Sequence, residues 1–195
     1  GDVQLRALER GEMDAGFMLH GAGFAPTGLQ RVLVASEPMV LALPQHHALA
    51  RKKQLRLQDI WEAPLVTFPR RIAPSLHDAI FAMYHAAEQL PVVAQEAIQM
   101  QTIVNLVSAG LGVAWVPASV QQFQRPGVVY RSVQGGVPVC ETSLVWVRSS
   151  RSADALWAAE QVLRSGSCGA LLFWQNHARG ETLRRLQLGC EKLRA

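Results

Sequence analysis

The stretch that decides the fold is residues 96–117, EAIQMQTIVNLVSAGLGVAWVP. From Met100 to Ser108 its apolar residues recur at helical spacing and form one apolar stripe. Ala109-Gly110 ends the predicted helix, because glycine tolerates the left-handed conformation found just after a helix. Leu111 to Val116 follows as a short buried strand, closed by Pro117. A helix–turn–strand unit of this kind is typical of an α/β fold.

The start of this predicted helix is a candidate binding site. Thr102, preceded by the polar residues Gln99 and Gln101, stands where a helix favours an N-cap. The free backbone N–H groups and the dipole of a helix start attract anions. An ordinary helix–turn–strand unit without any ligand explains the same periodicity, so the rest of the chain has to decide between these interpretations.

Length and composition indicate a packed domain cut from a longer protein. The chain has 195 residues, 49% of them hydrophobic, and no apolar run approaches the roughly 20 residues that cross a bilayer. Its start, GDVQ, has neither an initiator Met nor the basic-then-apolar order of a signal peptide. Cys140, Cys168 and Cys190 are widely spaced, which favours reduced cytoplasmic thiols over a disulfide framework or a zinc site.

The net charge of +4 is distributed unevenly. Residues 151–195 carry seven Lys or Arg against four Asp or Glu, whereas residues 1–150 carry twelve against eleven. The nearly neutral first part therefore lacks the basic surface of a nucleic-acid-binding domain. Charges on the basic tail are explained by a solvated helix face.

Periodicity predicts the elements around residues 96–117. Val3 to Arg10 is expected to be an amphipathic helix ended by Gly11, and Leu29–Ala35 and Pro38–Leu43 two strands separated by Ser36-Glu37. Ser75 is the expected N-cap of a helix from Leu76 to about Gln89. The alternation of strands with helices predicts largely parallel sheets.

Several sequence motifs resemble the effector-binding domain of LysR-type transcriptional regulators. Residues 107–117, VSAGLGVAWVP, match the family's V-x-x-G-x-G-[VI]-x-x-[LV]-P pattern. Residues 8–17, LERGEMDAGF, resemble L-x-x-G-x-[LI]-D-x-[AG]-[IF], and residues 44–50, PQHHALA, resemble P-x-x-H-P-L-A with Ala48 in place of the usual Pro. Residues 57–66, LQDIWEAPLV, resemble L-x-[DE]-L-x-x-x-P-[LF]-[IV]. The motifs occur in the family's order and cover residues 1–148.

The resemblance implies an α/β, two-lobed, periplasmic-binding-protein-like effector domain with mostly parallel sheets. Lobe I would comprise residues 1–35 and 140–165, and lobe II residues 38–133. The family's winged helix–turn–helix and the first strand–helix–strand of lobe I would precede Gly1, so lobe I is expected to be incomplete.

The resemblance also implies an effector cleft between the lobes, at the carboxyl ends of their strands. In lobe II the loop after one strand would face the start of the helix in the opening stretch. The hydroxyls of Thr67 and Thr102 would donate to a carboxylate, and Arg70 or Arg71 would bind it bidentately unless both are simply solvated. Phe68 and Met100 would pack on an apolar ligand body. The expected effector-binding residues are Thr67, Phe68, Pro69, Arg70, Arg71, Gln99, Met100, Gln101 and Thr102.

The expected function is therefore sensing of a small organic anion by a bacterial transcription regulator. Ligand binding would shift the angle between the lobes. Partners and setting are implied by the family: DNA only through a missing N-terminal domain, a homo-oligomer in the full-length parent, the cytoplasm, and no membrane or cofactor. An enzyme is not expected, because the chain has no G-x-S-x-G elbow and no recognisable Cys–His pair.

One histidine pair raises the question of a metal site. His46 and His47 are adjacent, so their side chains point in different directions, and no third ligand is evident. Hydrogen bonding of one or both imidazoles within a loop is the expected role.

The tail departs from the LysR pattern. After a predicted helix at Asp154–Leu163, residues from about 153 to 190 resemble RecA-like proteins of the SOS response, the cell-division inhibitors and translesion-accessory proteins, with residues 166–195 as a strand–helix tail. No G-x-x-x-x-G-K-[ST] loop is present, so nucleotide hydrolysis is not implied. The alternative function is a protein–protein interaction module whose tail binds a cell-division or DNA-repair partner. Completion of lobe I by the tail is the preferred interpretation, since an open sheet edge needs cover.

Overall fold

The protein is described by a computed structural model that covers residues 2–13 and 15–147. These residues divide into two compact units. Unit 1 contains the described residues up to His20, residues 24–36 and residues 141–147, and unit 2 contains residues 21–23 and 37–140. The expected helix at 154–163 and the expected RecA-like tail lie outside the described residues.

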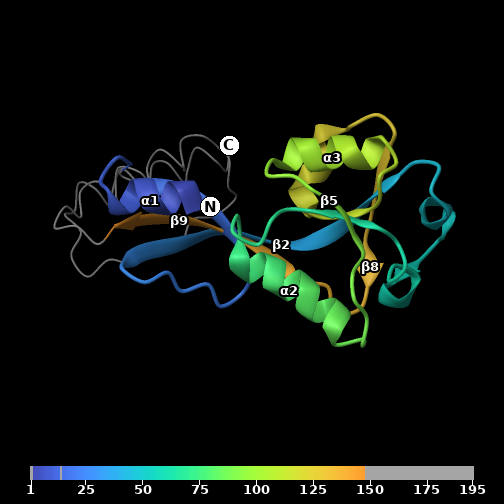
Figure 1. The fold of residues 1–195 in the computed structure, drawn as a ribbon, viewed down its shortest axis with the longest axis horizontal. Coiled ribbons are helices and arrows are strands. Elements are labelled where there is room, and N and C mark those ends of the chain that lie inside the picture. The colour runs from blue at the N-terminus through green and yellow to red at the C-terminus, as the bar shows by residue number, and fades with distance from the viewer. Residues whose placement is uncertain (1, 14, 148–195) are drawn as a thin grey trace, which may run out of the picture. The chain divides into compact units, whose positions relative to one another are not determined.

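Unit 1 is a small sheet with a helix packed on it (Figure 1). Strand β1 pairs antiparallel with β9, in a register that runs from Ala15↔Trp146 to His20↔Glu141, and β9 neighbours β2. Leu8 of the helix is buried with Met18 and Val145 of the strands, as expected for the apolar face of an amphipathic helix. The elements are α1 (Asp2–Glu9), β1 (Ala15–His20), and parts of β2 (Leu29–Pro44) and β9 (Val139–Val147).

Unit 2 holds the larger core. In it β2 pairs antiparallel with both β6 and β7, whereas β4 pairs parallel with β5, and β3 with β8. The elements are β3 (Leu55–Arg56), β4 (Leu65–Thr67), α2 (Pro74–His85), β5 (Val93–Glu96), α3 (Met100–Ser108), β6 (Ala114–Pro117), β7 (Val128–Arg131), β8 (Val133–Gln134) and the 3-10 helices Ala48–Arg51, Leu57–Asp59 and Ala118–Phe123. Among the described helices, none is long and apolar enough to span a membrane.

Two expectations about the strands are corrected. The two strands expected around Ser36-Glu37 are a single strand, β2, which continues through Pro38. Its first half is mostly exposed or half-buried and its second half is buried, because β2 leaves unit 1 at Ser36 and enters unit 2 at Glu37. The polar pair therefore marks the change of unit and not a turn. The expected mostly parallel sheets are also wrong for β1–β9, β2–β6 and β2–β7, which are antiparallel.

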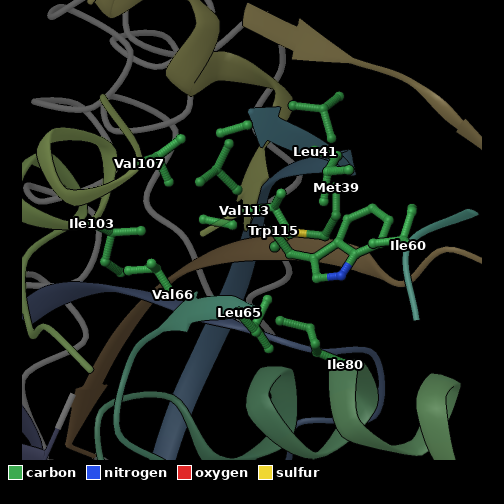
Figure 2. Close-up of a cluster of buried hydrophobic side chains, with 14 of the residues drawn as sticks. Met39, Leu41, Ile60, Leu65, Val66, Ile80, Ile103, Val107, Val113 and Trp115 are labelled. Atoms are coloured by element: carbon green, nitrogen blue, oxygen red, sulfur yellow. The ribbon is translucent and has the colours of Figure 1, made fainter. Parts of the chain in front are cut away.

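The core of unit 2 is built around the β4–β6 region, with a helix on each side of it (Figure 2). Trp115 of β6 lies among Met39, Ile60 and Leu65, and it is 3% exposed. Helix α2 contributes Ile80 from one side, and α3 contributes buried residues from the other. The indole Nε1 of Trp115 donates to the hydroxyl of Tyr84 at 3.3 Å, so the buried polar group of each aromatic ring is satisfied.

The turn after α3 is a Schellman motif. Gly110 has a φ of 83°, its N–H donates to the carbonyl of Val107 at 2.9 Å, and Leu111 N–H donates to the carbonyl of Leu106 at 3.2 Å. The expected end of this helix at Ala109-Gly110 is confirmed. Gly112 has a different role, because a Cβ there would lie 2.2 Å from the carbonyl oxygen of Pro64.

We predict that Gly112→Ala destabilises the protein more than Gly110→Ala. The first substitution forces two backbones apart and should cost about 3 kcal/mol, as overpacking of a core does. The second only places a side chain at positive φ in open space and should cost about 1 kcal/mol. Urea denaturation of the two variants measures both costs. Equal costs would mean that the strand after α3 can move away from Pro64.

We also predict that both tyrosines of the chain ionise above the ordinary range. Burial raises the pKa of Tyr84 and of Tyr130, and the hydrogen bond from Trp115 offsets part of the increase at Tyr84. A folded-state pKa above the unfolded value adds stability that is lost as the pH rises past about 10. In a spectrophotometric titration, fewer than half of the tyrosines should be ionised at about pH 10 in the folded protein. The urea-unfolded chain is the control, and it should be about half ionised there.

Candidate functional site

The parallel pairing of β4 with β5 brings the two predicted effector-binding segments to one edge of unit 2. Thr67 and Glu96, the last residues of these strands, are register partners, and Ala97 N–H donates to the carbonyl of Thr67 at 2.9 Å. The chain leaves β4 through residues 68–73 into α2, and it leaves β5 through residues 97–99 into α3. We call this the β4–β5 edge. The structure thus places the expected residues on neighbouring segments, as parallel strands require.

The residues on the β4 side of this edge are buried. Thr67, Phe68 and Pro69 are buried, and both Thr67 and Phe68 are 4% exposed. The ring of Phe68 meets the ring of His77 edge-on, with centroids 6.1 Å apart. Phe68 is therefore packed into the core cluster of unit 2.

The start of α3 differs from the sequence-based expectation. The N-cap is Gln99, whose carbonyl accepts from Ile103 N–H at 3.1 Å, and Thr102 is the third helical residue. The helix begins earlier because Met100 packs against the core of unit 2 and so joins the helix as its first residue. Gln99 makes no side-chain capping bond, and the first turn of a helix has N–H groups without intrahelical partners. Gln99, Gln101 and Thr102 are exposed, so the polar side chains of this helix start face solvent.

Arg70 is engaged by a residue that the sequence analysis did not consider. Its Nε donates to Oδ1 of Asp78 and its terminal nitrogen to Oδ2, each at 2.7 Å, which is a bidentate ion pair. The hydrogen bonds that Arg70 donates hold the pKa of the Asp78 carboxyl below its usual value, and the same bonds to the carboxylate raise the pKa of Arg70. Arg71 is exposed, and no ion pair of it is found within the described chain. Of the two candidate arginines, Arg71 is the one whose guanidinium has no ion pair among the described residues 2–13 and 15–147.

The start of α2 also corrects an expectation. Ala73 is the N-cap and Pro74 the first helical residue, because the fixed φ of proline suits that position. Ser75 is therefore not the cap, and its hydroxyl accepts a hydrogen bond from Gly21 N–H at 3.1 Å. A Cβ at Gly21 would lie 2.7 Å from the Ser75 carbonyl oxygen, so only glycine fits there. The helix ends at His85, before the expected Gln89, and it buries Leu76, Ile80, Met83 and Tyr84.

The histidine pair before the first 3-10 helix acts as expected within a loop. The Nδ1 of His47 accepts from Leu49 N–H at 3.2 Å, and His46 hydrogen-bonds to Gln45 at 2.9 Å. The prediction of loop hydrogen bonding is confirmed. In residues 2–13 and 15–147, no cluster of three His, Cys, Asp or Glu residues is arranged to hold a metal ion.

Asp78 and His77 are the residues of this edge that sequence reasoning missed. His77 stacks on Phe81, with ring centroids 4.1 Å apart, and its Nδ1 lies 3.5 Å from Oδ1 of Asp78. No periodicity pairs Arg70 with Asp78, because the chain changes direction between them. An acidic residue in the early turns of α2, close after two arginines, was the available signal.

The sequence comparison identifies the family. A family model described as the LysR substrate binding domain matches residues 1–167. The chain belongs to this family. It is 40% identical over 168 residues to the HTH-type transcriptional regulator IlvR of Caulobacter vibrioides, which covers 85% of this chain and 55% of that protein. It is also 32% identical over 130 residues to AlsR of Bacillus subtilis, an alignment that covers 67% of this chain and 42% of AlsR. The chain thus spans about half the length of these LysR-type relatives, and the family is one of transcriptional regulators.

Solved structures of LysR-type regulators show the same fold. The effector-binding domain of BenM with its effector benzoate has a TM-score of 0.64 at 22% identity, covering 85% of this chain and 74% of that one. CbnR, a LysR family transcriptional regulator, has a TM-score of 0.66 at 25% identity, and the match covers 84% of this chain and 56% of the CbnR chain. The expected α/β, two-lobed, periplasmic-binding-protein-like fold class is confirmed. The expected RecA-like resemblance at about 153–190 finds no support, and the LysR family model covers its first part, up to residue 167.

Proposed function

We propose that this chain is the small-molecule-sensing domain of a LysR-type transcription regulator and that it binds a small organic anion at the β4–β5 edge. One observation carries the location: the β4–β5 pairing sets the N–H groups at the start of α3 beside the loop that contains Arg71. A helix start and an unpaired guanidinium both favour a carboxylate. The BenM domain of the same fold is described with benzoate as its effector, which supports an aromatic acid as the first probe.

The proposed roles follow from burial and position. Thr102, with Gln99 and Gln101, supplies exposed polar groups at the helix start. Thr67 is buried at the end of β4, where its hydroxyl would complete the carboxylate site. The apolar part of the ligand would contact Phe68, Pro69 and Met100.

We further propose that DNA binding belongs to a part of the regulator outside this chain. The matched relatives are named HTH-type regulators, and this chain spans about half of their length. Full-length CbnR has been crystallised in complex with its target DNA. The regulator would act in the bacterial cytoplasm as a homo-oligomer, and the effector would change its DNA affinity through the sensing domain.

Thermal unfolding with a panel of ligands tests the proposal. The panel contains benzoate, cyclohexanecarboxylate and the neutral isostere benzamide. An acid present at 100 times its dissociation constant should stabilise the protein by about 2.7 kcal/mol, and benzamide should not. Thr102→Ala should weaken acid binding about tenfold, because it removes a hydrogen bond to a charged group.

Thr27→Ala is the matched control, since Thr27 is an exposed threonine of unit 1 and outside the β4–β5 edge. It should bind the acids like the parent protein. A cooperative unfolding transition that no carboxylate shifts would refute the organic-anion proposal. Equal weakening by both threonine substitutions would place the ligand away from the β4–β5 edge.

A further inference from the structure

The charged side chains near the β4–β5 edge balance one another. The cations are Arg70 and Arg71, and the anions are Asp78 on α2 and Glu96 at the end of β5. Asp78 already accepts two hydrogen bonds from the Arg70 guanidinium, from Nε and one terminal nitrogen, at 2.7 Å each. The part of this edge that remains for a ligand therefore has one guanidinium, that of Arg71, without an ion pair in the described part of the chain, and the carboxylate of Glu96 stands at the neighbouring strand end.

We propose that Asp78 is a specificity-determining residue of the anion site, because it occupies Arg70 and restricts the site to ligands with a single carboxylate. This inference rests on the proposed function. It assigns a ligand class, monocarboxylic acids in preference to dicarboxylic acids, and it names the residue that sets the preference.

The electrostatic reason is competition for one guanidinium. A monocarboxylate needs a single cation, which Arg71 and the start of α3 supply. The second carboxylate of a dicarboxylate needs Arg70, and to take over the bidentate edge formed by Nε and one terminal nitrogen the ligand has to displace Asp78. Displacement leaves the Asp78 carboxylate uncompensated beside a ligand of charge −2, and like charges at short distance repel.

The Arg70–Asp78 pair is suited to this role because it is well aligned and exposed. The side chains are 65% and 48% exposed, so the pair competes with water and has modest strength. A pair of this kind discriminates between ligands without holding the fold together. The Nδ1 of His77 lies 3.5 Å from Oδ1 of Asp78.

The geometry of the loop supports the same conclusion. Residues 68–73 connect β4 to α2, and Arg70 lies in the middle of this connection. Its bidentate bond to Asp78 ties the loop to α2, and on the adjacent position of α2 the His77 ring contacts Phe68 at the end of β4. Arg70 is thus held towards α2 by its bond to Asp78, and the neighbouring contact between His77 and Phe68 holds the start of the loop against the same helix.

The test compares benzoate with phthalate, a dicarboxylate of the same ring, by calorimetric titration at about pH 8, above the ordinary histidine pKa. The parent protein should bind benzoate more tightly than phthalate. Asp78→Asn keeps the shape of the side chain and removes its charge, so it should tighten phthalate binding about fivefold and benzoate binding less than about twofold. Arg70→Gln, alone or combined with Asp78→Asn, should show no gain for phthalate.

Asp59→Asn is the matched control. Asp59 is an aspartate of the same unit that is also paired with a cation, Lys52 at 2.6 Å, but it lies in a different segment of the chain. The Asp59→Asn substitution removes one negative charge, as Asp78→Asn does, and it should leave the ratio of the benzoate and phthalate affinities unchanged.

The outcomes separate this inference from the proposed function. If the parent protein binds benzoate but Asp78→Asn changes both affinities by the same factor, the role of Asp78 is refuted and the proposed function stands. If Asp59→Asn reproduces the selective gain for phthalate, net charge and not Arg70 explains it, and the inference is likewise refuted. If no variant binds either acid, both the inference and the organic-anion proposal are overturned.

Discussion

The three-residue strand β4 makes the hydrogen bonds on which the rest of unit 2 depends. On one side Leu65 N–H donates to Val92, and Ala97 N–H donates to Thr67. On the other side Val66 and Pro64 exchange bonds with Val113, at 2.8 Å each. This double pairing requires the backbone to approach closely at Gly112, where no side chain would fit. Because every residue of β4 is buried, an unpaired peptide group there would be expensive, and the strand therefore fixes the position of both neighbours.

The candidate site is a consequence of this pairing. Two parallel strands that end together deliver two loops and two helix starts to the same edge, and one helix start attracts anions through its free N–H groups. The side chains then set which part of the edge a ligand finds unoccupied. Arg70 is bound to Asp78, whereas Arg71 is not paired within the described residues. Two adjacent exposed arginines thus differ in pairing: Arg70 is bound by Asp78, and Arg71 has no ion pair among the described residues.

Function follows from the combination of family and site. Membership of the LysR substrate-binding family implies a role in regulation, but relatives about 30–40% identical that match this chain over half their length do not define its ligand. The proposed site at the β4–β5 edge adds a ligand chemistry, because a polar helix start and the Arg71 guanidinium, which has no ion pair within the described residues, would complement a carboxylate. The buried Phe68 and the partly buried Met100 give the same edge an apolar component, which an organic acid would contact.

The sequence by itself determined the family, the order of the elements and the end of α3. These depend on local properties: apolar spacing, and glycine where a positive φ is needed. Local propensity misplaced both helix starts, because the packing of Met100 and the backbone of Pro74 outweigh the capping preference of Thr102 and Ser75. It also divided β2 at a polar pair that only marks the passage between units.

Only the tertiary structure decided what Arg70 does. The loop between β4 and α2 reverses the chain, so the direction of α2 determines that Asp78 meets the guanidinium of Arg70. The pairing of β4 with β5 and Val113 was likewise invisible in the sequence, since it joins segments about 30 to 50 residues apart. Sequence patterns encode which residues favour a helix or a strand. Which distant groups meet depends on how those elements pack, because burial and hydrogen bonding are satisfied between segments and not within them.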